Sequence, residues 1–191
     1  ILIFVANPQF LPFLWIGGTG VGFIGIFLSL ESYRLERLAI WRNPELYEKG
    51  YQTMQGLYAI GSGGLFGVGL GESMQKLGFV PEAQNDMIFS IICEELGLTG
   101  AVAVLVIFGL LIWRLMVIAT WTKDLFGALL AAGVMGHIMI QVILNVAVVT
   151  NTIPNTGITL PFVSYGGTSV VFLLLEMGIA LSVSRGVRKE H

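Results

Sequence analysis

Long apolar runs alternate with polar segments along this chain. A bilayer core takes about 20 helical residues, and four runs reach that length. They cover approximately residues 10–30, 87–114, 125–149 and 162–183. Residues 1–6 look like the tail of an earlier membrane helix, so we expect the chain to be the C-terminal part of a longer protein. The pattern predicts an all-α fold, a polytopic bundle of transmembrane helices.

Basic residues predict the orientation of this bundle, because short cytoplasmic segments are enriched in Lys and Arg. They are Arg114 and Lys123 after the second span, and Arg185, Arg188 and Lys189 in the tail. Four spans place both groups on one side of the membrane. We therefore expect a cytoplasmic C-terminus, with the uncharged segment "VTNTIPNTGITL" and residues 31–86 outside.

The extracellular loop, approximately residues 31–86, is too long to be a simple connector and is a functional candidate. Its first part, "SYRLERLAIW", sets Leu35, Leu38 and Trp41 at helical spacing, which predicts a helix on the membrane surface. Its second part, "QGLYAIGSGGLFGVGLGESMQK", is rich in glycine. Glycine allows close approach of backbones, so this part predicts a close-packed or re-entrant segment.

Composition places the chain among membrane proteins and excludes several functions. Hydrophobic residues make up 55%, charged residues 12%, and the mean hydropathy is +0.83. A net charge of −2 argues against a nucleic-acid partner. The single cysteine, Cys93, cannot form an internal disulfide. The glycines match neither the Walker nor the Rossmann spacing of nucleotide-binding loops. Ser164 lacks the glycine that stands two residues before the serine in the nucleophile elbow of serine hydrolases.

Polar residues inside the predicted spans need an explanation, because they are costly in lipid. Gly133, His137, Gln141 and Asn145 recur every four residues and share one face of the third span. Two interpretations remain: hydrogen bonding between helices, or the lining of a substrate cavity. Glu176, half-way along the fourth span, must be neutral or paired, and a helix preceding this chain could carry its partner.

The segment "GFVPEAQNDMIFSIICEELG" brings acidic residues to the start of the second span. Pro81 is suited to the position before a helix, and Asn85 or Asp86 would cap it. In a continuous helix Glu94 lies about 80° around and about 12 Å beyond Asp86. Glu94 and Glu95 are therefore expected to support helix packing. A carboxylate at a helix N-terminus stays ionised, so Asp86 suits a general base or a ligand of a hard cation.

Three segments resemble the SEDS family (shape, elongation, division and sporulation), which includes RodA, FtsW and SpoVE. They are "YRLERL", the stretch from "GYQTMQGLYAIGSGG" to "DMIFSIICEELG", and "NTGITLPFVSYGGTS". The likeness covers nearly the whole chain and is nearest to the FtsW/SpoVE branch. It implies a fold of about ten helices in the bacterial cytoplasmic membrane. It also implies a peptidoglycan glycosyltransferase that polymerises lipid II, working with a class B penicillin-binding protein and other divisome proteins.

The resemblance also implies roles for individual residues. The family's catalytic pattern P-E-x-H-T-D-F-I-F reads PEAQNDMIF here, so Asp86 takes the catalytic role, as base or as ligand of Mg²⁺ or Mn²⁺. Gln84, Asn85 and Met87 depart from the pattern. Expected substrate contacts are Gln52, Gln55, Gln75, Lys76, Glu82, Ser164 and Tyr165. The alternatives are a lipid II transporter using Glu176 and the polar stripe, and a non-catalytic division scaffold.

Overall fold

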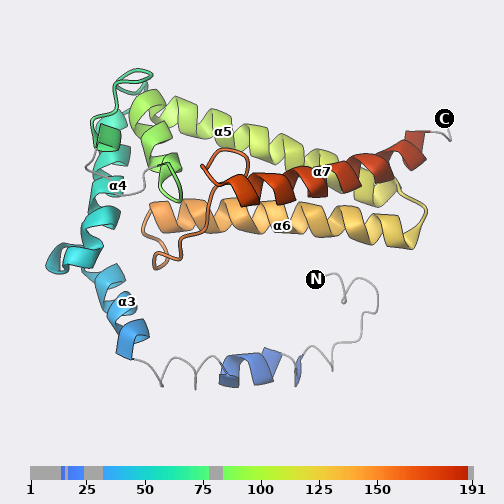
Figure 1. Cartoon of the computed structure of the whole chain (residues 1–191), viewed down its shortest axis with the longest axis horizontal. Helices are drawn as coiled ribbons and strands as arrows, with labels where there is room; N and C mark the ends of the chain where they lie inside the picture. The colour runs from blue at the N-terminus through green and yellow to red at the C-terminus, as the bar shows by residue number, and fades with distance from the viewer. Residues whose placement is uncertain (1–13, 16, 24–31, 78–83, 189–191) are drawn as a thin grey trace.

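The regular elements of the described part of the chain are all helices, joined by turns and loops. The computed structural model describes residues 14–15, 17–23, 32–77 and 84–188, and its elements confirm the predicted all-α class (Figure 1). They are α3 (Ser32–Arg42), α4 (Tyr51–Gly63), α5 (Ile88–Trp121), α6 (Leu125–Val149) and α7 (Gly167–Arg188), with 3-10 helices at Pro44–Leu46, Glu48–Gly50 and Gln75–Leu77. The first predicted span and residues 1–6 lie largely outside the described residues.

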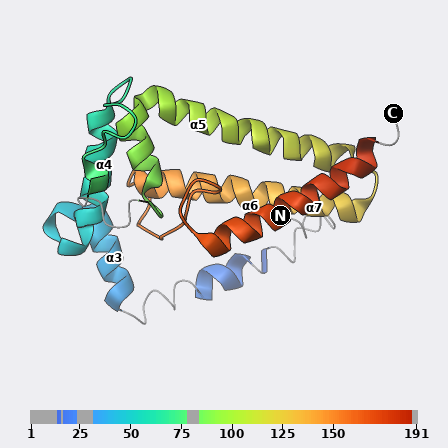
Figure 2. The same ribbon diagram turned by 45° about the horizontal axis from the view of Figure 1, so that its top comes forward.

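Among the described residues, three helices, α5, α6 and α7, are long and apolar enough to cross a membrane. They run side by side, with α6 packed against both of the others (Figures 1 and 2). The α5–α6 connection and the C-terminal end of α7 lie at one end of this bundle. Helices α3 and α4 and the α6–α7 segment lie at the other end. The arrangement is that of a multi-pass membrane protein.

The bundle core is built from small and branched apolar residues. On α6 the buried residues Ala131, Ile138 and Val142 recur at helical spacing and form one inward face. Phe108 of α5 and Leu173 of α7 belong to the same buried core. Many large apolar side chains on the outward faces of the spans are exposed instead, as lipid-facing side chains are.

Helix α5 is broken at Gly97, where φ is +66° and ψ is −165°. Residues 88–96 run beside α4, while residues 98–121 continue along the bundle (Figure 2). The second part is about 36 Å long at 1.5 Å per residue, so it is long enough to cross the hydrocarbon core by itself. The predicted second span, residues 87–114, therefore contains a helix break at Gly97 that its hydropathy did not indicate.

Much of the expected extracellular loop is helical. The predicted surface helix corresponds to α3, and the first half of the glycine-rich stretch belongs to α4. Gly56, Ala59 and Gly63 form the buried face of α4, which packs against α5. A Cβ atom on Gly63 would come within 1.9 Å of the Cys93 carbonyl oxygen. The glycines therefore serve close helix packing here, as the sequence indicated.

A polar cavity around Asp86

Asp86 lies in a turn that precedes α5 and does not cap this helix. The N-cap position belongs to Met87, whose side chain carries no oxygen that could accept from the first turn. The expectation that Asn85 or Asp86 caps the span is therefore wrong. Asp86 is also not at an open surface: the residue is 8% exposed and forms part of the wall of a polar cavity.

This cavity has a volume of about 310 Å³ and is formed by segments far apart in the sequence. Its lining comes from α3, α4, the turn before α5 and the α6–α7 segment: Glu36, Arg37, Ile40, Trp41, Thr53, Asp86, Asn151, Asn155, Thr156 and Gly157. Carboxylates, one guanidinium, amides and hydroxyls predominate. Such a lining suits a ligand with hydroxyl and phosphate groups, because most of these side chains can donate or accept hydrogen bonds.

Two long-range contacts hold the turn in place. Gln52 Nε2 of α4 donates to Asp86 Oδ1 at 3.2 Å. Asn145 Nδ2 of α6 donates to the Asp86 carbonyl oxygen at 2.8 Å and to the Ile158 carbonyl oxygen at 2.7 Å. Asn145 is completely buried. The position of the Asp86 carboxylate is thus determined by α4, by α6 and by the α6–α7 segment together.

Helix α3 closes the cavity from the other side. Trp41 Nε1 donates to the Asn151 carbonyl oxygen at 2.9 Å, and Asn151 Nδ2 donates back to the Trp41 carbonyl oxygen at 3.3 Å. Arg37 Nη1 donates to the Asn155 carbonyl oxygen at 3.4 Å. The sequence assigned no site role to these residues, although Arg37 lies in "YRLERL" and Asn155 in "NTGITLPFVSYGGTS".

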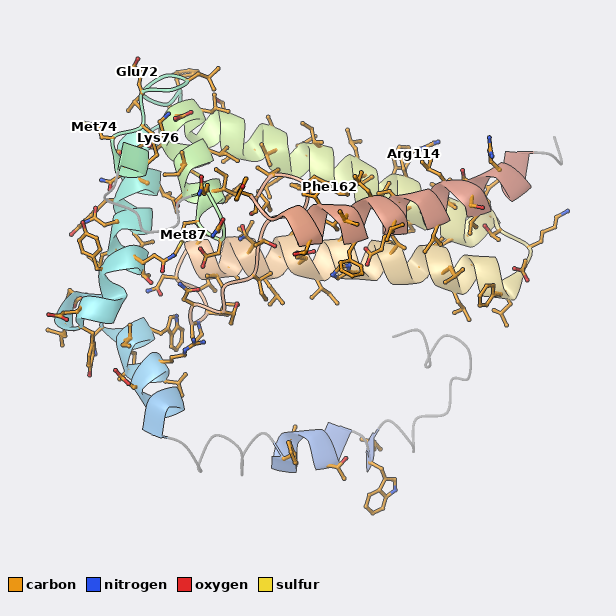
Figure 3. The ribbon with its side chains drawn as sticks, in the orientation of Figure 1. Glu72, Met74, Lys76, Met87, Arg114 and Phe162 are labelled. Carbon is orange, nitrogen blue, oxygen red and sulfur yellow. The ribbon has the colours of Figure 1, made fainter. Side chains whose placement is uncertain are left out.

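Glu94 and Glu95 of α5 bind the C-terminal end of the glycine-rich stretch, residues 73–76. Glu94 is 3% exposed and accepts from Ser73 Oγ and from Met74 N, the latter at 3.2 Å. Lys76 Nζ lies 2.5 Å from Glu95 Oε1. Figure 3 shows Met74 and Lys76 near the upper end of α4, whereas Met87, next to Asp86, lies lower, beside α6. The charge of Lys76 is therefore engaged away from the cavity.

The other expected substrate contacts are dispersed. Gln55 and Gln75 are half-buried on α4 and on the 3-10 helix Gln75–Leu77. Ser164 is buried, and its Oγ accepts from the Leu160 backbone N–H at 2.7 Å. Tyr165 is 74% exposed, and its backbone N–H donates to the Gln84 carbonyl oxygen at 2.8 Å. Glu82 lies outside the described residues. Gln52 is the expected contact that the structure brings to Asp86.

The polar stripe on α6 is bonded to other parts of the chain. His137 Nδ1 lies 2.8 Å from Glu176 Oε2 on α7, so the partner of Glu176 belongs to this chain rather than to a preceding helix. Gln141 Nε2 donates to Thr159 Oγ1 at 3.3 Å, and Asn145 holds the Asp86 turn. These bonds favour the hydrogen-bonding interpretation of the stripe over the cavity-lining one.

The cavity supplies only part of a metal site. The described residues contain no group of three or more His, Cys, Asp and Glu side chains that could hold an ion. Asp86 and Glu36 are the carboxylates in the cavity lining. Mg²⁺ is typically held by one or two carboxylates together with water and substrate phosphates. The donor types therefore suit Mg²⁺ or Mn²⁺ only together with a phosphate-bearing ligand, and Asp86 and Glu36 are the residues that would hold such an ion.

Comparison with known sequences agrees with these features. A family profile, FTSW_RODA_SPOVE, described as cell cycle protein, matches residues 1–189. Stage V sporulation protein E of Bacillus subtilis is 46% identical over 188 residues, which are 97% of this chain and 51% of the relative. A probable peptidoglycan glycosyltransferase FtsW of Trichlorobacter lovleyi is 40% identical over 98% of this chain and 50% of the relative. The chain thus spans about half the length of these relatives.

Solved structures match as well. One is described as structural coordination of polymerization and crosslinking by a peptidoglycan synthase complex. The match covers 98% of this chain and 52% of the chain in that structure, with a TM-score of 0.75 and 27% sequence identity. A mutant of the rod shape determining protein RodA from Thermus thermophilus matches 68% of this chain and 39% of its own with a TM-score of 0.53 and 36% identity. The structural matches agree with the helical fold described above. The family profile and the related sequences show that the chain belongs to the FtsW/RodA/SpoVE family of cell cycle proteins.

Proposed function

We propose that the full-length protein is a peptidoglycan glycosyltransferase that polymerises lipid II at the outer face of the cytoplasmic membrane. The FtsW relatives carry that enzymatic name, and a structural relative is a peptidoglycan synthase complex. The observation that carries the proposal is the Asp86 carboxylate, held by Gln52 in the wall of a polar cavity at one end of the bundle.

The reaction needs little more than one well-placed carboxylate. A sugar hydroxyl of one substrate attacks the anomeric carbon of the other, the new C–O bond forms with inversion, and the bond to the lipid pyrophosphate breaks. Asp86 accepts the proton of the attacking hydroxyl, and the pyrophosphate leaves with the electron pair. In the alternative role, Asp86 and Glu36 would together hold a divalent cation, which would neutralise the charge on that leaving group.

The remaining lining residues would bind and orient the substrate. Asn151, Asn155 and Thr156 present hydrogen-bonding groups opposite Asp86, and Arg37 adds a positive charge suited to phosphate. A class B penicillin-binding protein is the expected partner, because glycan strands that are made at this face require cross-linking. The cell-division apparatus would recruit the pair.

The decisive experiment measures glycan-strand formation from lipid II by the purified full-length protein, with its transpeptidase partner, in detergent. Asp86→Asn keeps the size and the Gln52 contact but removes the negative charge. We expect strand formation to fall by at least about 100-fold, the lower range for loss of a general base. Elution as a folded species and unchanged partner binding would show that the variant is intact.

Glu72→Gln is the matched control, because it removes an exposed carboxylate from the same end of the molecule. Its activity should equal that of the parent protein. Normal polymerisation by Asp86→Asn would disprove the catalytic role. Activity that EDTA abolishes and Mg²⁺ or Mn²⁺ restores would support the cation, whereas activity unaffected by EDTA would reject it.

A transporter using Glu176 and the polar stripe finds less support. His137, Gln141 and Asn145 each make a hydrogen bond to another segment of the chain. A translocation path would instead require polar groups that are available to the moving headgroup. Asn145 is fully buried, whereas the side chains of His137 and Glu176 are 52% and 29% exposed, so the pairing of these groups, rather than their burial, argues against a path.

A further inference from the structure

An apolar loop projects where α4 turns towards α5. Leu65, Phe66, Val68 and Leu70 are 62%, 80%, 47% and 77% exposed. Contiguous apolar side chains of this size are rare on a surface that faces water. The loop lies at the end of the bundle that carries the Asp86 cavity, beside the break in α5 (Figures 1 and 2). It makes no contribution to the cavity lining.

The backbone of this loop is hydrogen-bonded to α5 on both sides of the break. The bonds are Val68 N to Glu94 O (3.0 Å), Gly69 N to Glu95 O (3.0 Å), Leu98 N to Gly64 O (2.9 Å) and Thr99 N to Leu65 O (3.1 Å). Breaking a helix leaves such carbonyls and amides without their usual partners. Non-helical backbone is tolerated at membrane depth only where its polar groups are satisfied, and these bonds satisfy them.

Glycines give the loop its shape. Gly67, Gly69 and Gly71 have φ values of +80°, +119° and +87°, a region that other residues rarely adopt. A Cβ atom on Gly67 would lie 2.1 Å from the Glu95 carbonyl oxygen. The tight backbone therefore packs on α5, and the apolar side chains between the glycines are left on the outside.

The polar groups of the neighbouring residues are directed to α5 rather than to this apolar surface. Ser73 is buried against Glu94, and Lys76 pairs with Glu95. Glu72, which follows the apolar residues in the sequence, lies at the outer edge of the loop (Figure 3). The segment is thus amphipathic without being a helix.

We propose that residues 65–70 are immersed in the bilayer, in the leaflet on the side of the Asp86 cavity. We identify the bilayer as what covers this apolar surface, because the surface continues into exposed apolar residues of α5, a helix that is long and apolar enough to cross a membrane. Leu98 and Val102, 56% and 49% exposed, follow the break directly, and Leu98 is bonded to the loop. This inference goes beyond the proposed enzymatic function and does not depend on it.

The test uses site-directed spin labelling of the full-length protein in phosphatidylethanolamine–phosphatidylglycerol vesicles. Single cysteines replace Phe66 and Leu70 in a background whose other cysteines are alanine. Relaxation by oxygen, which concentrates in lipid, is compared with relaxation by a water-soluble nickel chelate. Val106, exposed on α5, is the lipid reference. Thr152, exposed in the α6–α7 segment, is the water reference.

We expect oxygen-to-nickel accessibility ratios at positions 66 and 70 that match Val106 and exceed Thr152 several-fold. Leu46 serves as a matched control, because it is 72% exposed and apolar but lies in the turn between α3 and α4. Its ratio should fall below those of the loop. Nickel accessibility at 66 and 70 as high as at Thr152 would overturn the proposal. Low accessibility to both reagents would also overturn it, since that outcome indicates contact with protein.

Discussion

Asn145 has the most constrained side chain near the cavity. It is completely buried on α6, and its amide nitrogen bonds the backbone of Asp86 and of Ile158. One side chain therefore joins the turn before α5 to the segment between α6 and α7. Asn145 touches backbone and not the Asp86 carboxylate, so we regard it as a positioning residue.

Replacing Asn145 with alanine should lower both stability and turnover. Each buried group left without its partner costs about 1–3 kcal/mol, and the Asp86 turn loses its link to α6. We expect a lower thermal unfolding midpoint in detergent and a reduced kcat, with a smaller change in KM. Circular dichroism melting and lipid II polymerisation measure the two effects.

Gln141→Ala is the comparison for Asn145→Ala, one helical turn away. Gln141 makes one bond, of 3.3 Å, to a side chain, whereas Asn145 makes two bonds, of 2.8 and 2.7 Å, to backbone carbonyl oxygens. The amide oxygens of both residues are buried without a hydrogen-bond partner among the described atoms, so the two differ in their donated bonds. Its loss should be nearly neutral for stability. Equal effects of the two substitutions would show that Asn145 has no special role in positioning Asp86.

Sequence reasoning located Asp86 but not the residues that hold it. Asp86 stood out as a charge at the boundary of an apolar run, a local signal. Gln52 and Asn145 lie 34 and 59 residues away, and Trp41 and Asn151 are 110 residues apart. Such partners depend on how helices pack in three dimensions, and no local pattern reports this. The N-cap expectation failed for the same reason, because tertiary contacts determine where α5 begins.

Among the helices of the bundle, hydropathy predicted where α6 lies but did not predict the break in α5. The predicted span 125–149 coincides with α6, because apolar length is a strong signal. The break at Gly97 was missed, because a glycine inside an apolar run is compatible with a continuous helix and with a broken one. The hydrogen bonds from residues 64–69 decide between the two, and they come from a distant segment.

The break itself can be tested with two glycine substitutions. Gly67→Ala places a methyl group against the Glu95 carbonyl oxygen and forces a positive φ on alanine. It should destabilise the protein by about 2–4 kcal/mol. Gly109→Ala, inside α5 with no atom within 4 Å of the new Cβ, should stabilise it by about 0.5–1 kcal/mol. Thermal unfolding in detergent measures both; shifts of the same sign would contradict the packing at the break.

For the whole molecule, the arrangement of the helix ends predicts membrane orientation. The α5–α6 connection and the end of α7 share one end of the bundle (Figure 1), and this end carries Arg114, Lys123 and Arg185. The positive-inside tendency therefore places it in the cytoplasm. Lys123→Cys should be protected from a membrane-impermeant maleimide in spheroplasts, and Thr152→Cys should be labelled.

Arg185→Cys gives an independent check, because it lies near the end of α7. It should behave as Lys123→Cys does, and both should react once the spheroplasts are lysed. Labelling of Lys123→Cys in intact spheroplasts would reverse the orientation and place the Asp86 cavity in the cytoplasm. That result would remove the basis for polymerisation at the outer face.

The bonded break in α5 has a consequence for how a lipid-linked substrate meets the protein. Carbonyls and amides on both sides of Gly97 are bonded to one loop. This loop therefore joins residues 88–96 and residues 98–121 into one packed unit, although the helix itself is broken between them. The Asp86 turn lies just before residues 88–96 and is therefore tied, through this loop, to the part of α5 that follows the break. In the proposed reaction, this arrangement would keep the Asp86 carboxylate level with the pyrophosphate of a substrate whose lipid tail anchors it in the same leaflet.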